Sequence, residues 1–164
     1  MPQPERKRLR LPDHDYSSPG AYFVTICTKD RRCILSRITV GEGLAPPAVE
    51  LTGVGIIVEE QIRALPERYP SIAVDKYVIM PNHVHLLLCL KEGAGGASPS
   101  PTLFDVLRVF KSMSTRRARG LLGPLPLWQR SYYEHVIRSE GDAQEIQAYI
   151  DRNPAAWAED QYYA

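Results

Sequence analysis

Residues 77–90, with the sequence YVIMPNHVHLLLCL, constrain the fold more than any other stretch of the chain. Two runs of strand-forming apolar residues flank Pro81-Asn82, a pair that interrupts a strand and favours a tight turn. The segment therefore predicts two adjacent antiparallel strands, at about 73–80 and 83–90. Because apolar residues occupy nearly every position of the second run, we expect a core strand.

The other elements follow from apolar spacing of period 2 or 3.6. Helices are predicted to begin after three capping residues, Thr52, Thr102 and Ser139, and the last helix is expected to end near Arg152, before Asn153-Pro154. Together these elements predict an α+β fold, a ferredoxin-like antiparallel sheet with helices packed on it. The remaining strands are expected at 21–28, in two short pieces within 36–52, and at 132–138.

Two histidines stand one residue apart in the predicted core strand. Side chains alternate between the faces of a strand, so His83 and His85 point the same way and Val84 points into the core. Two imidazoles on one face can converge on a single cation. The alternative is a pair of hydrogen-bonded buried histidines without a metal.

The predicted last helix carries Tyr149 and Asn153 four residues apart, hence on one helix face at the edge of an apolar stripe. An amide oxygen of Asn153 would supply a third metal ligand, with Tyr149 beside it. A tyrosine oxygen attacks a phosphate poorly unless a cation polarises the target. These four residues together therefore suggest phosphoryl transfer, although a core-edge tyrosine and a helix-terminal asparagine would fit the helix alone.

Charge is segregated along the chain, although the net charge is only +1. Residues 1–37 hold eight Lys and Arg against four acids, residues 101–138 hold seven against two, and residues 139–164 hold one against six. Two basic blocks favour a surface that binds a polyanion, whereas separate solvated faces would explain the same counts.

Length and composition suit one domain with its own core, since the chain has 164 residues, of which 44% are hydrophobic. We expect residues 1–20 to form a basic N-terminal arm and residues 21–164 a single domain. No apolar run approaches the roughly 18 residues of a membrane span, and the charged N-terminus lacks the features of a signal peptide. A cytoplasmic protein without membrane contact is therefore expected.

Three segments together resemble the REP-associated tyrosine transposases of the IS200/IS605-like HUH (Y1) transposase superfamily. The HUH motif of that family, two histidines around a bulky hydrophobe, matches residues 83–85. Its catalytic tyrosine matches Tyr149, and its polar metal ligand four residues later matches Asn153. The resemblance thus implies the HUH motif on a central strand and the catalytic tyrosine on the last helix. The three segments are RLRLPDHDYSSPGAYFVTICTKDR, YVIMPNHVHLLL and WQRSYYEHVIRSEGDAQEIQAYIDRNPA.

This resemblance implies an enzyme that cleaves and rejoins single-stranded DNA next to palindromic hairpins. The implied intermediate is a 5′-phosphotyrosine, and the implied cofactor is Mg²⁺ or Mn²⁺. The implied partner is single-stranded or hairpin DNA with REP-like palindromes, which would associate the protein with the nucleoid. A monomer and a homodimer both remain open. Two alternatives are a domesticated protein that binds palindromes without cleaving them and a metal-dependent hydrolase of small phosphoesters.

The residues expected to contact DNA come from both basic blocks. For the N-terminal block, a solvated tail is an equal alternative. Trp128 is either a platform for unpaired bases or a buried core residue, and His135 is expected to have a structural role. The expected DNA contacts are Arg6, Lys7, Arg8, Arg10, Lys111, Arg116, Arg117, Arg119 and Arg130.

Overall fold

The computed structural model describes residues 20–39, 46–91 and 101–163. Within these ranges, a four-stranded antiparallel sheet has the order β4-β5-β1-β6. This is the strand order of a ferredoxin-like βαββαβ unit, as the sequence predicts. The sheet strands are β1 (Gly20–Cys27), β4 (Ile72–Ile79), β5 (His83–Leu90) and β6 (Tyr133–Ile137), and a separate small hairpin joins β2 (Ser36–Thr39) to β3 (Ala48–Leu51).

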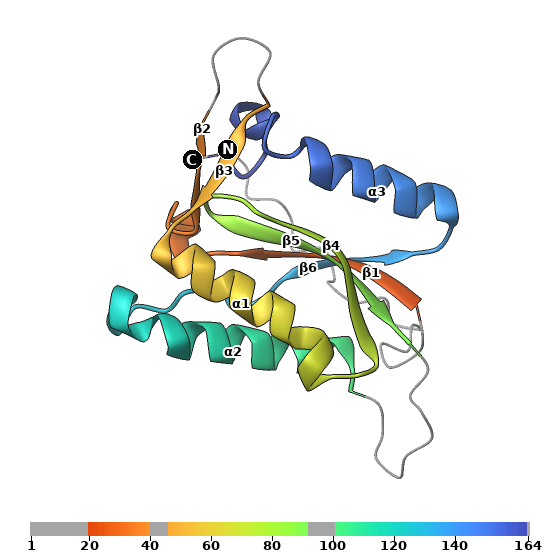
Figure 1. The fold of residues 1–164 in the computed structure, drawn as a ribbon, viewed down its shortest axis with the longest axis horizontal. Helices are drawn as coiled ribbons and strands as arrows, with labels where there is room; N and C mark the ends of the chain where they lie inside the picture. The colour runs from red at the N-terminus through yellow and green to blue at the C-terminus, as the bar shows by residue number, and fades with distance from the viewer. Residues whose placement is uncertain (1–19, 40–45, 92–100, 164) are drawn as a thin grey trace.

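Helices cover both faces of the sheet. In Figure 1, α1 (Gly53–Arg68) and α2 (Leu103–Leu122) lie on one face, whereas α3 (Glu140–Arg152) lies on the other. Among the described residues, every helix falls short of the length and apolar character needed to cross a bilayer. Four predicted DNA contacts, Arg6, Lys7, Arg8 and Arg10, lie outside the described residues, as does most of the predicted N-terminal arm.

The predicted hairpin of β4 and β5 is present, with Pro81-Asn82 at its turn. The Met80 N–H donates to the carbonyl of His83 at 2.8 Å and closes that turn. β5 is the most buried strand, because α1 and α2 cover one of its faces and α3 with the following C-terminal segment covers the other. Val84, Leu86 and Leu88 face the α1–α2 core. Burial on both faces explains why the strand is almost continuously apolar.

The predicted helix caps are found at all three helices. Thr52 accepts the Gly55 N–H at 3.1 Å, and Thr102 forms a reciprocal capping box with Asp105. Ser139 accepts the Asp142 N–H at 3.0 Å. The carboxylate of Asp142 instead lies 2.8 Å from Nε2 of His135 on β6. His135 therefore connects the last strand to the last helix, in line with the structural role expected for it.

The first turn of α1 passes very close to the loop that precedes β2. A Cβ on Gly55 would lie 1.9 Å from the carbonyl oxygen of Leu35. That oxygen is held in place, because it accepts hydrogen bonds from both the N–H and the hydroxyl of Thr52, each at 3.0 Å. Only glycine fits here, and the glycine lets the first turn of α1 pack against the Leu35 backbone before β2.

We predict that Gly55→Ala lowers the free energy of unfolding by about 2 kcal/mol or more, because overpacking a fixed backbone contact is costly. Thermal denaturation followed by circular dichroism measures this effect. Gly120→Ala is the matched control, since a Cβ there meets nothing within 4 Å on α2. The control should raise stability by about 0.5–1 kcal/mol, the usual gain for removing a helical glycine. Equal effects of the two substitutions would contradict the close approach.

Candidate functional site

The two histidines of the HUH motif lie side by side on the face of β5 that is turned away from α1 and α2. Their ring centroids are 4.7 Å apart. They leave the α1–α2 core, as strand alternation predicts, but they do not reach solvent, because their exposed fractions are 0% and 1%. Tyr149 of α3 packs 5.3 Å from His85, and Tyr162 of the C-terminal segment packs 4.5 Å from His83, between ring centroids. The motif is thus enclosed between the sheet and the C-terminal part of the chain.

One nitrogen of each imidazole is held by a neighbouring side chain. Nδ1 of His83 lies 2.8 Å from Oδ1 of Asn82, and Nδ1 of His85 lies 2.8 Å from the hydroxyl of Thr25. The orientation of the Asn82 amide is itself defined, because its nitrogen donates to the carbonyls of Tyr162 at 2.6 Å and Arg31 at 3.4 Å. Nδ1 of His83 therefore carries the proton, and its Nε2 presents a lone pair.

Three buried polar atoms in this region have no hydrogen-bond partner among the described residues: Nε2 of His83, Nε2 of His85 and Oδ1 of Asn153. The two imidazoles are in contact, and the Asn153 amide lies close enough to affect the pKa of His83. Leaving such an atom unpaired in the interior costs about 1–3 kcal/mol. A divalent cation would satisfy all three atoms at once. Two imidazole nitrogens and one amide oxygen, two of them oriented by outer hydrogen bonds, are a chemically suitable donor set for such an ion.

Burial keeps both imidazoles in the neutral form that ligates metals. It lowers the pKa of His83 from 6.5 to about 4, with the Asn153 amide opposing this change and Arg31 adding to it. Burial also moves the pKa of His85 well below 6.5, and the neighbouring His83 contributes in the same direction. Near neutral pH, neither nitrogen lone pair is lost to a proton.

Tyr149 borders this donor set from α3. Its ring meets His85 and also lies edge-on to Phe23, at 6.1 Å between centroids. Burial raises the pKa of the Tyr149 phenol, whereas a hydrogen bond from the Asn153 amide lowers it. The tyrosine also lines an open hollow along α3 together with Arg152. It can therefore meet a substrate from outside while its ring stays next to the histidines.

Asn153 is more enclosed than its predicted position at the edge of an apolar stripe suggests. Its exposed fraction is 3%. The reason is the segment after α3, which turns through a short 3₁₀ helix, Trp157–Glu159, and places Asp160 and Tyr162 over the site. All four residues predicted for the centre thus come together: His83, His85, Tyr149 and Asn153.

Four further residues shape this centre but escape sequence reasoning. Thr25 faces His85 across the β1–β5 ladder, and only the pairing register reveals this. Asn82 follows a proline and reads as a turn residue, although its position next to the HUH motif is a usable signal. Asp160 and Tyr162 lie in a short tail with no periodic pattern.

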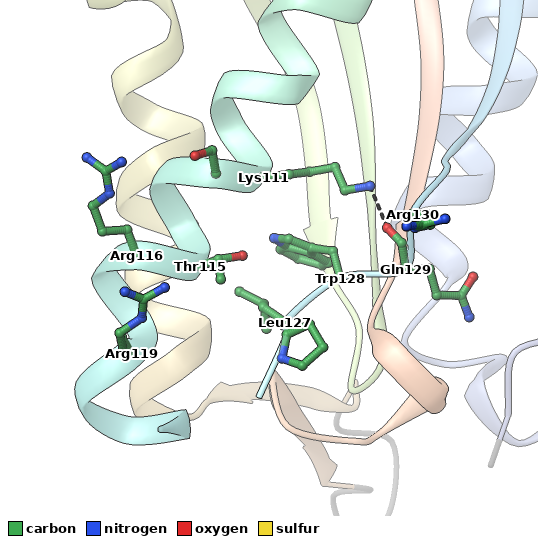
Figure 2. Close-up of a pocket in the computed structure, with 10 residues that line it drawn as sticks. Lys111, Thr115, Arg116, Arg119, Leu127, Trp128, Gln129 and Arg130 are labelled. Atoms are coloured by element: carbon green, nitrogen blue, oxygen red, sulfur yellow. Dashed lines mark hydrogen bonds between the residues drawn. The ribbon is translucent and has the colours of Figure 1, made fainter. Parts of the chain in front are cut away.

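The basic residues of α2 lie at a second place, on the face of the sheet that α1 and α2 cover and that is opposite α3. Figure 2 shows Arg116 and Arg119 extending from α2 and Arg130 on the segment that follows the helix. Between them lies an open pocket of about 340 Å³. Arg117 does not line this pocket, so the structure groups only some of the predicted DNA contacts around it.

Two residues of this pocket have internal roles, the predicted DNA contact Lys111 and Trp128, for which the sequence leaves two interpretations open. Lys111 is half-buried and donates to the carbonyl of Gln129, which fixes the loop to α2 (Figure 2). Trp128 is 6% exposed and its indole N–H donates to the Ser114 hydroxyl at 2.8 Å. Of the two interpretations of Trp128, the structure supports a buried core residue.

Comparison with known proteins identifies relatives of the whole chain. No family model matches it. A protein of Haemophilus influenzae strain Rd without an assigned function is 32% identical over 173 residues, covering 96% of this chain and 93% of the relative. The chain belongs to the family of this Haemophilus influenzae protein.

Solved structures show that this family member has the fold of a Y1 transposase. A REP-associated tyrosine transposase bound to a REP hairpin is similar over 87% of this chain and 70% of its own, with a TM-score of 0.60 and 23% identity. A provisionally assigned transposase from Deinococcus radiodurans R1 is similar over 87% of this chain and 97% of its own, with a TM-score of 0.50 and 23% identity. The resemblance noted in the sequence is thereby confirmed for the fold.

The buried histidines predict an acid-sensitive fold when no metal is added. Between pH 6.5 and about 4 the unfolded chain binds a proton at His83 and the folded chain does not. The free energy of unfolding should therefore fall as pH falls through this window, by roughly 3 kcal/mol at full extent. Thermal midpoints measured in chelator should show a weaker fall for His83→Gln than for the wild type. Identical pH profiles would contradict a neutral, buried His83.

Proposed function

We propose that this protein is a transposase-type endonuclease that cuts and rejoins single-stranded DNA beside palindromic hairpins, with Tyr149 as the nucleophile. The observation that carries the proposal is the position of Tyr149 next to three buried, unpaired donor atoms, on His83, His85 and Asn153. A tyrosine and a metal-ligand set in contact form the arrangement that covalent phosphoryl transfer requires.

In the proposed reaction, the Tyr149 oxygen attacks a phosphodiester phosphorus. A bond forms between that oxygen and phosphorus, and the bond from phosphorus to the 3′ oxygen breaks. The phenol loses its proton, and the departing 3′ oxygen gains one, which leaves a 5′-phosphotyrosine and a free 3′-OH. Attack by a 3′-OH on the phosphotyrosine reverses these steps and rejoins a strand.

Oδ1 of Asn153 and Nε2 of both histidines would hold a divalent ion, which supplies Lewis-acid polarisation of the phosphate when bound. The donor set favours Mn²⁺ at least as much as Mg²⁺, because imidazole nitrogen suits the softer ion. The chain itself raises the pKa of Tyr149 by burial. The Tyr149 phenol is therefore uncharged at neutral pH, and in the proposed reaction it loses its proton only as it attacks a phosphate held next to it.

The basic pocket supports a polyanionic substrate. Arg116, Arg119 and Arg130 surround it with exposed guanidinium groups, which are suited to phosphate oxygens. A structural neighbour is bound to a REP hairpin, and we propose the same class of DNA for this chain. Such a substrate would place the protein with the nucleoid in the cytoplasm.

We predict that Tyr149→Phe abolishes both cleavage of a labelled single-stranded hairpin and the denaturation-resistant protein–DNA adduct. The substitution removes one oxygen, so the fold and the DNA affinity should change little. Gel analysis of cleavage and adduct formation measures both products. Tyr133→Phe is the matched control, because Tyr133 is 46% exposed on β6; it should cleave like the wild type.

Normal cleavage by Tyr149→Phe would assign the nucleophile to another tyrosine or to water. Tight hairpin binding by the wild type without any adduct, in Mn²⁺ as well as Mg²⁺, would instead identify the domesticated binding protein considered above.

A second expectation concerns the basic pocket. The double variant Arg116→Gln/Arg119→Gln should weaken hairpin binding. It should also reduce the slope of the logarithm of the binding constant against the logarithm of salt concentration by about 1.8, because each lost phosphate contact removes about 0.9. Fluorescence anisotropy over a salt series measures the slope. Arg117→Gln, on the same helix but outside the pocket, should change it less. A double variant with the wild-type slope would exclude the pocket from the DNA interface.

A further inference from the structure

The helix that carries Tyr149 packs thinly on the sheet. Of the residues of α3, all of which the structure describes, Ile150 alone is buried. By contrast, α1 and α2 each bury six residues. A helix that buries little apolar surface is held only weakly in one orientation by packing. The orientation of α3 therefore depends more on polar contacts than that of the other two helices.

β4 supplies two such contacts, to residues one helix turn apart. Nε2 of Gln147 donates to Oδ2 of Asp75 at 2.9 Å. Nζ of Lys76 donates to both carboxylate oxygens of Asp151, at 2.8 and 2.7 Å. Because Gln147 and Asp151 are four residues apart, they lie on the same side of α3. We call these four residues the β4–α3 clamp.

A β-bulge makes this pair of contacts possible. In a regular strand, Asp75 and Lys76 would point to opposite faces of the sheet. The register of β4 against β5 instead shifts, so that Val74 pairs with Leu88 and Lys76 pairs with Leu87. Leu88 belongs to the core under α1 and α2, and its neighbour Leu87 faces the other way. The extra residue thus turns Lys76 toward α3, the helix that Asp75 also contacts.

The clamp lies on the opposite flank of α3 from Tyr149. Successive helix residues are about 100° apart, so Gln147 and Asp151, each two positions from Tyr149, lie about 200° around the axis from it. The clamp holds its flank to β4, at one end of the strand order. The Tyr149 ring packs on His85 of β5 and near Phe23 of β1. A rotation of α3 about its axis would therefore break the clamp and displace the phenol together.

We propose that Asp75 and Lys76 are positioning residues, which set the rotation of α3 about its axis and so direct the Tyr149 oxygen toward the phosphate. This inference rests on the proposed role of Tyr149 as the nucleophile. The side chains of Lys76 and Asp151 are 32% and 64% exposed, and exposed ion pairs contribute little to overall stability. The clamp should therefore affect the geometry of the reaction far more than the stability of the fold.

Reversal and exchange of the two charges test the clamp. Lys76→Glu places two carboxylates against each other. It should slow single-turnover cleavage at saturating hairpin DNA about tenfold or more, because a misplacement of about 1 Å can cost a hundredfold. The double variant Lys76→Glu/Asp151→Lys restores the attraction and the net charge of the wild type, so it should recover most of the rate.

A second measurement follows the helix without DNA. Amide hydrogen exchange, read by mass spectrometry, should be faster across α3 in Lys76→Glu than in the wild type and should slow again in the double variant. Arg63→Glu is the matched control, because it reverses one charge of an ion pair within α1, Arg63 with Glu59 at 3.2 Å. This control should change neither the cleavage rate nor the exchange of α3.

The outcomes separate this inference from the proposed function. A wild-type rate in Lys76→Glu at saturating DNA would overturn the inference, as would a slow rate that the double variant does not recover. If the wild type itself forms no adduct with hairpin DNA, the proposed function is wrong; unchanged exchange of α3 in Lys76→Glu shows separately that the clamp does not hold the helix. Should thermal midpoints show that Lys76→Glu does not fold, Lys76→Gln replaces it, and a wild-type rate there likewise contradicts the clamp.

Discussion

The structure depends on the burial of β5 on both of its faces. On one face, Val84 and Leu86 join the core under α1 and α2. On the other face, the same strand must place two imidazoles where water cannot reach them. Their Nδ1 atoms are satisfied by Thr25 and Asn82, and their Nε2 atoms are not. One face of β5 thus contributes to the apolar core, whereas the other face carries two buried nitrogen atoms without a hydrogen-bond partner among the described residues.

This division explains why the site lies between elements that are distant in sequence. β1 supplies the hydroxyl that holds His85, the turn before β5 supplies the amide that holds His83, and the C-cap of α3 supplies Asn153. The contact of Asn82 with His83 joins neighbours in sequence, whereas the contact of Thr25 with His85 is long-range in sequence. The amide of Asn82 also binds the carbonyl of Tyr162, so the turn, the histidine and the C-terminal segment form one hydrogen-bonded unit. Such a unit fixes the orientation of the His83 ring before any ion binds.

Most of the fold could be predicted because its patterns are strong and local. The β4–β5 hairpin follows from two apolar runs around Pro81-Asn82, and the helix starts follow from hydroxyl side chains such as Thr102. The HUH pair follows from strand alternation. The enclosure of the site could not be predicted, because it depends on how a tail without periodicity packs. The role of Thr25 required the register of β1 against β5, and the internal engagement of Lys111 required a contact with a loop carbonyl.

The sheet also separates the two places where DNA would be handled. The basic pocket lies on the face covered by α2, and Tyr149 lies on the face covered by α3. One backbone connection between them is at the end of β1, where the Gln129 N–H donates to the carbonyl of Cys27, the residue paired with His83. In the proposed reaction, a nucleic acid that occupies both places would pass from one face of the sheet to the other. Its contour length between the anchored phosphate and the scissile phosphate then acts as a ruler, so the position of the cut would be set by distance as much as by base sequence.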